Sequence, residues 1–180
     1  KSISLGMVEE IKSKIRTVPD FPKQGILFRD VTTLLKDPLG LRDVMKYFKI
    51  RYKGRKIDKI VAIESRGFIL GATLAYMLGV GFVPIRKANK LPAHTRRIDY
   101  AMEYGSDSLE IHTDSIVPGE RVLLIDDVLA TGGTCKAATQ LIESLGGIVS
   151  ECAFLIELSN LKGREKLEDY NIFSLIEYTE

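Results

Sequence analysis

The sequence lacks the features that mark several large classes of protein. Only two of its 180 residues are cysteines, Cys135 and Cys152, and they lack the spacing and the neighbouring ligands of a metal site. No apolar run is long enough to span a bilayer and no signal-peptide pattern opens the chain, so we expect a cytoplasmic protein. The formal net charge of +2 is too small to indicate nucleic acid or a membrane as a partner.

The composition is that of an ordinary globular protein. Hydrophobic residues make up 45% of the chain and charged residues 28%. There is no internal repeat, low-complexity tract or interior linker, and the length suits one domain with a proper core. We therefore expect a single domain over residues 1–180. The alternation of strand and helix patterns from Ile57 onward predicts a parallel α/β sheet.

The most informative stretch is residues 121–134, RVLLIDDVLATGGT. An apolar run typical of a buried strand ends at two adjacent carboxylates, Asp126 and Asp127, which a parallel strand would bring to the sheet edge where α/β folds bind ligands. The next residues precede a helical pattern, so their backbone N–H groups and the helix N-terminus predict a phosphate site. That loop consists of Ala130, Thr131, Gly132, Gly133 and Thr134. Because the acids would repel a phosphate, we expect them to face hydroxyls or a metal, which together predicts a ribose 5-phosphate site.

This stretch resembles the phosphoribosyl pyrophosphate (PRPP) signature of the type I phosphoribosyltransferases. The shared pattern is four aliphatic residues, two acids, two spacers and a TGGT-like loop. The resemblance implies a central, mainly parallel sheet flanked by helices, with a small N-terminal hood and a flexible catalytic loop. It also implies that Asp126 and Asp127 hold the ribose hydroxyls beside the reacting carbon, while residues 130–134 bind the 5-phosphate. The alternative is a core strand followed by an exposed acid pair and a helix cap.

A second strand-to-helix junction predicts another anion site. The pattern of residues 57–63 predicts a strand and that of residues 68–78 a helix, so we expect the turn between them to bind an anion at the same sheet edge. In the family, the loop after the first core strand holds pyrophosphate. The resemblance therefore assigns pyrophosphate binding to Glu64, Ser65 and Arg66, with Arg66 giving bidentate contacts and serving catalysis. Without the family, Arg66 would equally suit a turn cap.

A basic cluster follows the next predicted strand, residues 80–85. The run RKANKLP, residues 86–92, resembles the RKxGKLP element of adenine phosphoribosyltransferases, which implies that Lys87 and Lys90 approach the PRPP phosphates. Asn89 stands where those enzymes have glycine. Because asparagine tolerates positive φ better than other residues, we expect the turn to be preserved. The alternative for the two lysines is a solvated face.

The N-terminal region predicts a helix and a base-binding hood. Residues 3–18 have the spacing of a modest amphipathic helix ended by Pro19, and residues 20–25 are turn formers. The block FPKQGILFRD resembles the hood of adenine phosphoribosyltransferases, which implies that the backbone at Leu27 and Arg29 binds the adenine edge and Phe28 contacts the ring. The alternative is a surface loop with a buried aromatic residue. We expect residues 1–35 to form the helix and hood, and residues 36–180 the core.

Residues 91–105 lack a clear period, and we expect them to form an irregular, mobile loop. The pattern EYG…LEIH matches the catalytic loop of the family, which implies catalytic roles for Glu103 and Tyr104. Glu103 would act as acid or base at the purine nitrogen. The Arg96–Asp99 run departs from the family pattern.

The rest of the chain completes the α/β pattern. Asp37-Pro38 predicts a helix start, residues 135–145 a helix and residues 148–158 a final long strand. Cys135 lies beside the predicted phosphate-binding helix end, where a thiol pKa can fall; the alternative, which we favour, is a small packing residue.

The resemblance, which extends from Phe21 to about Leu175, implies transfer of the 5-phosphoribosyl group from PRPP to adenine, giving AMP and pyrophosphate in purine salvage. It implies magnesium carried mainly by PRPP, with no direct protein ligands, and a homodimer without nucleic acid or membrane partners. A 6-oxo purine substrate is one alternative. A PRPP-sensing regulator is another, although it should carry a recognition helix or a strong basic patch, and the sequence shows neither.

Overall fold

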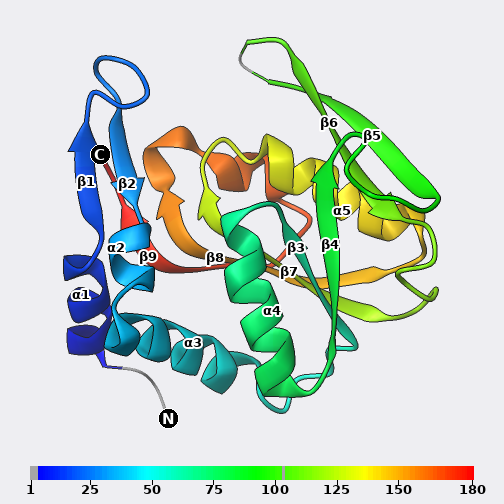
Figure 1. The fold of residues 1–180 in the computed structure, drawn as a ribbon, viewed down its shortest axis with the longest axis horizontal. Helices are drawn as coiled ribbons and strands as arrows, with labels where there is room; N and C mark the ends of the chain where they lie inside the picture. Colours follow the sequence, from blue (N-terminus) through cyan, green and yellow to red (C-terminus); the bar gives the residue numbers. More distant parts are fainter. Residues whose placement is uncertain (1–3, 103) are drawn as a thin grey trace. The chain divides into compact units, whose positions relative to one another are not determined.

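The computed structural model describes residues 4–102 and 104–180, and its fold is drawn in Figure 1. The chain divides into two compact units, the first ending at Lys53 and the second beginning at Gly54. The first unit extends beyond the predicted hood segment, because it also contains the helix after Pro38.

The first unit consists of three helices and a two-stranded antiparallel sheet. Its elements are α1 (Leu5–Ser13), β1 (Arg16–Pro19), β2 (Leu27–Asp30), α2 (Thr32–Leu35) and α3 (Pro38–Tyr52). The predicted start of α3 is confirmed, since Asp37 accepts a hydrogen bond from the backbone of Leu39 at 3.3 Å.

The predicted N-terminal helix is too long. It ends at Ser13, and Arg16–Pro19 forms a strand in which Val18 pairs with Phe28. The physical reason lies in Thr17 and Val18, which are β-branched, and in Pro19, which disfavours the helical conformation of the residue before it.

The second unit is a seven-stranded sheet with helices on both faces. Its elements are β3 (Lys59–Ile63), α4 (Arg66–Leu78), β4 (Gly81–Lys87), β5 (Thr95–Ala101), β6 (Ser106–His112), β7 (Arg121–Leu129), α5 (Gly133–Ser144), β8 (Ile148–Leu158), the 3-10 turns η1 (Ser159–Leu161) and η2 (Gly163–Leu167), and β9 (Ile172–Tyr178). The strand order is β5-β6-β4-β3-β7-β8-β9. Strands β4, β3, β7, β8 and β9 run parallel to one another. Strand β6 is antiparallel to both of its neighbours, β4 and β5. The sheet is therefore mainly parallel, as predicted.

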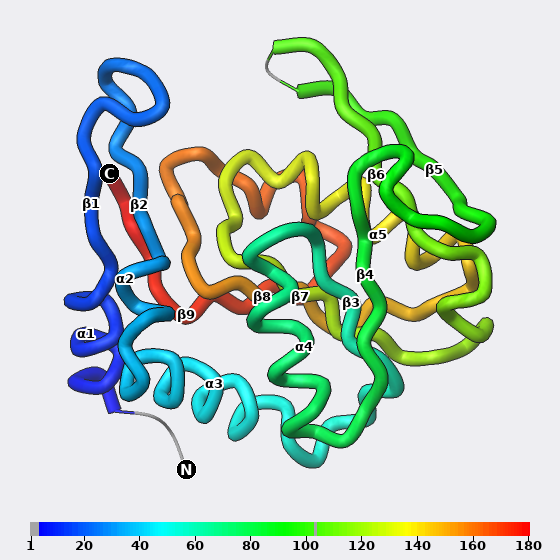
Figure 2. The backbone as a smooth tube through the Cα atoms, in the orientation of Figure 1, coloured from blue at the N-terminus to red at the C-terminus, as the bar shows by residue number. Residues whose placement is uncertain are grey.

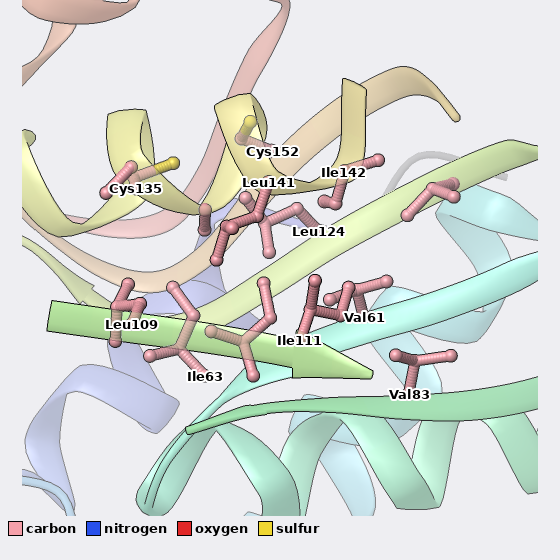
Figure 3. Packing of buried hydrophobic residues seen from close by; sticks show 14 of the residues in the cluster. Val61, Ile63, Val83, Leu109, Ile111, Leu124, Cys135, Leu141, Ile142 and Cys152 are labelled. Atoms are coloured by element: carbon pink, nitrogen blue, oxygen red, sulfur yellow. The ribbon is translucent and has the colours of Figure 1, made fainter. Parts of the chain in front are cut away.

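The alternation of side chains along the strands separates the two faces of this sheet. Residues at every second position, such as Val61 and Leu124, pack beneath α5 with Leu141, as Figure 3 shows. The opposite face carries α4, which approaches very closely: a methyl group on Gly71 would lie 2.7 Å from the side chain of Ala62. The glycine therefore brings α4 down onto the sheet.

Three sequence expectations for this unit are wrong in detail. The segment expected to be irregular contains β5, which pairs along its whole length with β6 in the hairpin traced in Figure 2. From Arg97 to Ala101 exposed and half-buried positions alternate, as in a strand with one covered face, which explains why no helical period was found. The apolar strand does not end at the two acids but continues as β7 to Leu129, because it still pairs with β8 there. Strand β8 is also followed by a further strand, β9.

Candidate active site

The order of the strands fixes the place of the site. β3 and β7 are neighbours, and the chain leaves them in opposite directions, through α4 to β4 and through α5 to β8. Such a reversal opens a crevice beyond the carboxyl ends of the two strands, where α/β sheets bind ligands.

A cleft of about 280 Å³ occupies this position. Most of the predicted site residues of the second unit line it: Glu64, Ser65, Arg66, Lys87, Asp126, Asp127, Ala130, Thr131, Gly132 and Thr134. Its apolar walls come from Ile63, Val128, Leu129, Cys135 and Phe154. Side chains separated by up to 91 positions in the sequence thus meet at one sheet edge.

Other predicted residues are placed differently. Gly133 begins α5 beside the cleft, and Lys90 is an exposed residue of the turn after β4; neither lines the cleft. Tyr104, near the tip of the β5–β6 hairpin, is 82% exposed. Glu103 lies outside the described residues.

The acid pair combines two different environments. Asp127 is buried, and one of its carboxylate oxygens accepts a hydrogen bond from Nε of Arg66 at 2.5 Å. Asp126 accepts the backbone N–H of Asp127 at 2.8 Å. Burial of the Asp126 carboxyl group, together with the nearby charge of Asp127, raises its pKa well above the usual value. Burial thus opposes the ionisation of Asp126, whereas Asp127 lies next to the guanidinium group of Arg66.

Helix α4 approaches the acid pair because its first turn contains glycine. A methyl group on Gly67 would lie 2.8 Å from Oδ1 of Asp126. This close contact places Arg66, the first residue of α4, across from β7. The Glu64–Ser65 peptide immediately before it is cis.

The carboxylate of Glu64 binds the end of β4. It accepts the backbone N–H of Lys87 at 2.6 Å and lies 3.3 Å from Nε of Arg86. It thereby joins the loop after β3 to the neighbouring strand.

Lys87 is held by groups of the β5–β6 hairpin that the sequence analysis did not identify. Its ammonium group pairs with the carboxylate of Asp107. Burial lowers the pKa of Lys87, but Asp107 and Tyr100 outweigh burial, so that its pKa is raised and it stays cationic. No sequence motif marks Asp107, because its role follows from strand register alone. The predicted turn after β4 is confirmed, since Asn89 has φ +66°.

The loop after β7 matches the predicted phosphate cradle in conformation. Gly132 has φ +88°, which is the left-handed region, and Gly133 begins α5. The N–H groups at this helix start have no partner within the helix, and the helix dipole favours an anion there. The hydroxyl of Tyr100 lies 3.3 Å from that of Thr134, so β5 reaches the same loop.

Cys135 is a packing residue. It is buried, and its pKa is raised by a hydrogen bond with the thiol of Cys152 and by burial. Both effects oppose formation of a thiolate, in agreement with a packing role for Cys135.

The predicted hood residues lie in the first unit. Phe28 packs edge-to-face against Phe21, with ring centroids 5.1 Å apart, and Nη1 of Arg29 donates to the hydroxyl of Thr17 at 2.7 Å. Leu27 is largely exposed. The strand β2 has one partner strand, so the backbone groups at alternate positions face away from the pair.

Residues 4–102 and 104–180 contain no group of three or more His, Cys, Asp or Glu side chains placed to hold a metal ion. In the same part of the chain, none of the helices combines the length and the apolar character needed to cross a membrane.

Comparison with known proteins gives consistent results. A family model described as the phosphoribosyl transferase domain matches residues 30–179. The adenine phosphoribosyltransferase of Nitrosospira multiformis is 58% identical over 171 residues, which cover 94% of this chain and 98% of that protein. The crystal structure of adenine phosphoribosyltransferase from Thermoanaerobacter pseudethanolicus superposes with a TM-score of 0.92 at 54% identity, covering 95% and 99% of the two chains. The Saccharomyces cerevisiae enzyme, solved with an imino-altritol bisphosphate and adenine, gives a TM-score of 0.92 at 42% identity, covering 96% and 99%.

Proposed function

We infer the reaction of this chain from its family, because the chain belongs to the phosphoribosyltransferases. Its relatives at 53–60% identity are adenine phosphoribosyltransferases over nearly their whole length. The chain accordingly transfers the 5-phosphoribosyl group from PRPP to adenine and releases AMP and pyrophosphate, a step of purine salvage. The single observation that carries this conclusion is the identity of 53–60% to adenine phosphoribosyltransferases, and the cleft lined by the acid pair and the two loops supports it.

The acid pair is our proposed ribose site. Cleavage of the bond between the ribose carbon and pyrophosphate builds positive charge on the sugar, as in other glycosyl transfers. Asp126 and Asp127 hold the ribose hydroxyls and place negative charge near this developing cation. The pairing of Asp127 with Arg66 supports the role, since it fixes the carboxylate at the cleft.

The two loops are proposed to bind the two ends of PRPP. Residues 130–134 anchor the 5-phosphate through their N–H groups, and this remote binding positions the reacting carbon. Arg66, Ser65 and Lys87 bind the pyrophosphate, with Lys90 at the rim and Glu64 holding the loop through Lys87. The observed conformation of Gly132 supports the first assignment and the cationic state of Lys87 the second.

The base is proposed to lie against Phe28, with the backbone at Leu27 and Arg29 reading its edge. These two residues are two apart on β2, so their peptide groups point to the same side. Glu103 acts as acid or base at the purine nitrogen, and Tyr104 closes the site with it. The exposed position of Tyr104, between β5 and β6, suits a lid.

Magnesium is proposed as the metal of the reaction. The cleft offers two adjacent carboxylates, one of them already paired with Arg66, which suits an ion that takes most of its oxygen ligands from PRPP and water. When bound, magnesium neutralises charge on the departing pyrophosphate.

A homodimer and a cytoplasmic location are also proposed. Ile69 and Tyr76, seven positions apart on one face of α4, are 44% and 88% exposed, an apolar stripe that suits a second copy of the chain. Sedimentation of Tyr76→Glu tests this, since wild-type behaviour of the variant would exclude the stripe from the interface. Two free, buried thiols suit a reducing compartment.

The function is tested by pyrophosphate release with PRPP and magnesium, offering adenine, guanine, hypoxanthine and xanthine in parallel. We expect turnover with adenine alone. Turnover with an oxo-purine instead would preserve the PRPP site and contradict the assignment of the hood. Absence of turnover with all four, in protein that binds PRPP, would favour a regulator.

A further inference from the structure

The phosphate loop rests on a second glycine, far along the chain. Gly163, the buried first residue of η2, contacts the loop so closely that a methyl group on it would lie 2.5 Å from the carbonyl oxygen of Ala130. Conversely, a methyl group on Gly132 would lie 2.5 Å from the carbonyl oxygen of Gly163. The two backbones are in direct contact, and neither side has room for a side chain.

Gly163 is itself held by an ion pair. The neighbouring Arg164 donates to both oxygens of Glu157, from Nε at 2.8 Å and from Nη2 at 2.9 Å. The hydroxyl of Ser174 donates to the same carboxylate at 2.8 Å. The side chain of Arg164 lowers the pKa of Glu157, which is only 5% exposed, so the carboxylate is charged and saturated with partners.

This ion pair is anchored next to the loop. Glu157 belongs to β8 and pairs in register with Leu129, the last residue of β7 before the phosphate loop. The loop therefore has its own strand on one side and, on the other, a turn bound to the adjacent strand.

We propose that Gly163, held by the Glu157–Arg164 pair, is a positioning residue for the 5-phosphate of the substrate. The proposal rests on the function proposed above for residues 130–134. That loop has no charged side chain, so its affinity depends on the direction of its N–H groups and of its threonine hydroxyls. Because hydrogen bonds weaken steeply with angle, a small displacement of Ala130 and Gly132 weakens several contacts to the phosphate at once.

Gly163→Ala tests the contact directly. Calorimetry should show ribose 5-phosphate bound about tenfold more weakly, the equivalent of one hydrogen bond to a charged group, with pyrophosphate affinity unchanged. Gly147→Ala is the matched control: Gly147 is also buried, its methyl group would lie 2.8 Å from Cγ2 of Ile142, and it lies at the opposite end of β8. The proposal would be overturned if Gly163→Ala and Gly147→Ala bound ribose 5-phosphate equally well. It would also be overturned if Gly163→Ala lost affinity for ribose 5-phosphate and for pyrophosphate to the same extent.

Arg164→Lys tests the ion pair, since lysine keeps the charge and loses the bidentate fork. We expect about threefold weaker ribose 5-phosphate binding. Arg55→Lys is the control, because Arg55 lies 3.4 Å from Glu151, a 6% exposed acid near the other end of β8. We expect Arg55→Lys to leave ribose 5-phosphate binding unchanged. If Arg164→Lys also leaves it unchanged and lowers only the melting temperature, the Glu157–Arg164 pair is merely structural and its positioning role is wrong.

Thr134→Val separates failure of this proposal from failure of the proposed function, because it alters the loop itself. If Thr134→Val weakens ribose 5-phosphate binding and Gly163→Ala does not, the phosphate site stands and the positioning role of Gly163 is wrong. If neither variant weakens it, the phosphate site is wrong, and the inference fails with it.

Discussion

The two loops that we propose to bind anions lie at the same sheet edge and differ in their residues. The loop after β3 brings charged side chains, with Arg66 paired to Asp127 and Lys87 nearby, whereas the loop after β7 contains only alanine, threonine and glycine. The first suits a group that leaves during the reaction, because long side chains follow a moving charge. The second suits a group that stays fixed, because backbone dipoles are rigid and need no reorganisation.

The largest expected effect tests the acid pair between these loops. Asp127→Asn removes the charge that Arg66 binds, and we expect turnover to fall by about 10²–10³, as when a preorganised electrostatic contact is lost. Steady-state kinetics measures this, with thermal melting as the control for folding. Equal turnover in the variant and the wild type would exclude the ribose role.

Glu103→Gln tests the proton transfer at the purine nitrogen, for which neither of the two loops provides a residue. Turnover should fall by about 10², the lower range for a lost acid or base, while PRPP affinity stays the same. Single-turnover kinetics and calorimetry separate the two quantities. A variant with unchanged turnover would remove Glu103 from the mechanism.

Tyr100→Phe tests the link between the loops. The Tyr100 hydroxyl lies 3.3 Å from that of Thr134 and also bonds to Lys87, so its loss should raise KM for PRPP about threefold. Tyr170→Phe is the matched control, because it removes a hydroxyl that bonds Glu143 at 2.7 Å outside the cleft. If Tyr100→Phe and Tyr170→Phe had the same KM for PRPP, the Tyr100 hydroxyl would have no role in PRPP binding.

The smallest effect concerns stability. Folding raises the pKa of Asp126 above that of an aspartate in the unfolded chain, which is about 4. The free energy of unfolding therefore falls as the pH rises above about 4. Asp126→Asn should therefore melt higher at neutral pH, by about 2–4 °C, and the gain should disappear in acid. Melting curves across pH measure this, and a gain that grows toward low pH would contradict the assigned direction of the pKa shift.

The sequence predicted those features that depend on local pattern. The alternating strands and helices, the start of α3 at Asp37-Pro38 and the turn at Asn89 follow from capping, periodicity and backbone preference, and the structure confirms them. The prediction failed where pairing partners decide. Residues 95–101 form a strand because β6 lies beside them, and in Arg16–Pro19 the pairing with β2 adds to the β-branched residues Thr17 and Val18.

The candidate site divides in the same way. The residues of the two loops stand out because glycines and charges follow apolar strands. Asp107 and Gly163 carry no such signal, because their importance comes from strand register and from backbone contact across more than 20 positions. Such contacts become visible only once the chain is folded.

The most direct test of this account is the affinity of three proteins for two ligands. Calorimetry with pyrophosphate and with ribose 5-phosphate would compare the wild type with Arg66→Ala and Gly132→Ala. The account predicts that Arg66→Ala weakens pyrophosphate binding more than ribose 5-phosphate binding, and that Gly132→Ala does the reverse, each by about tenfold or more for the ligand it affects most. Equal weakening of both ligands by either variant would contradict the division of roles between the two loops.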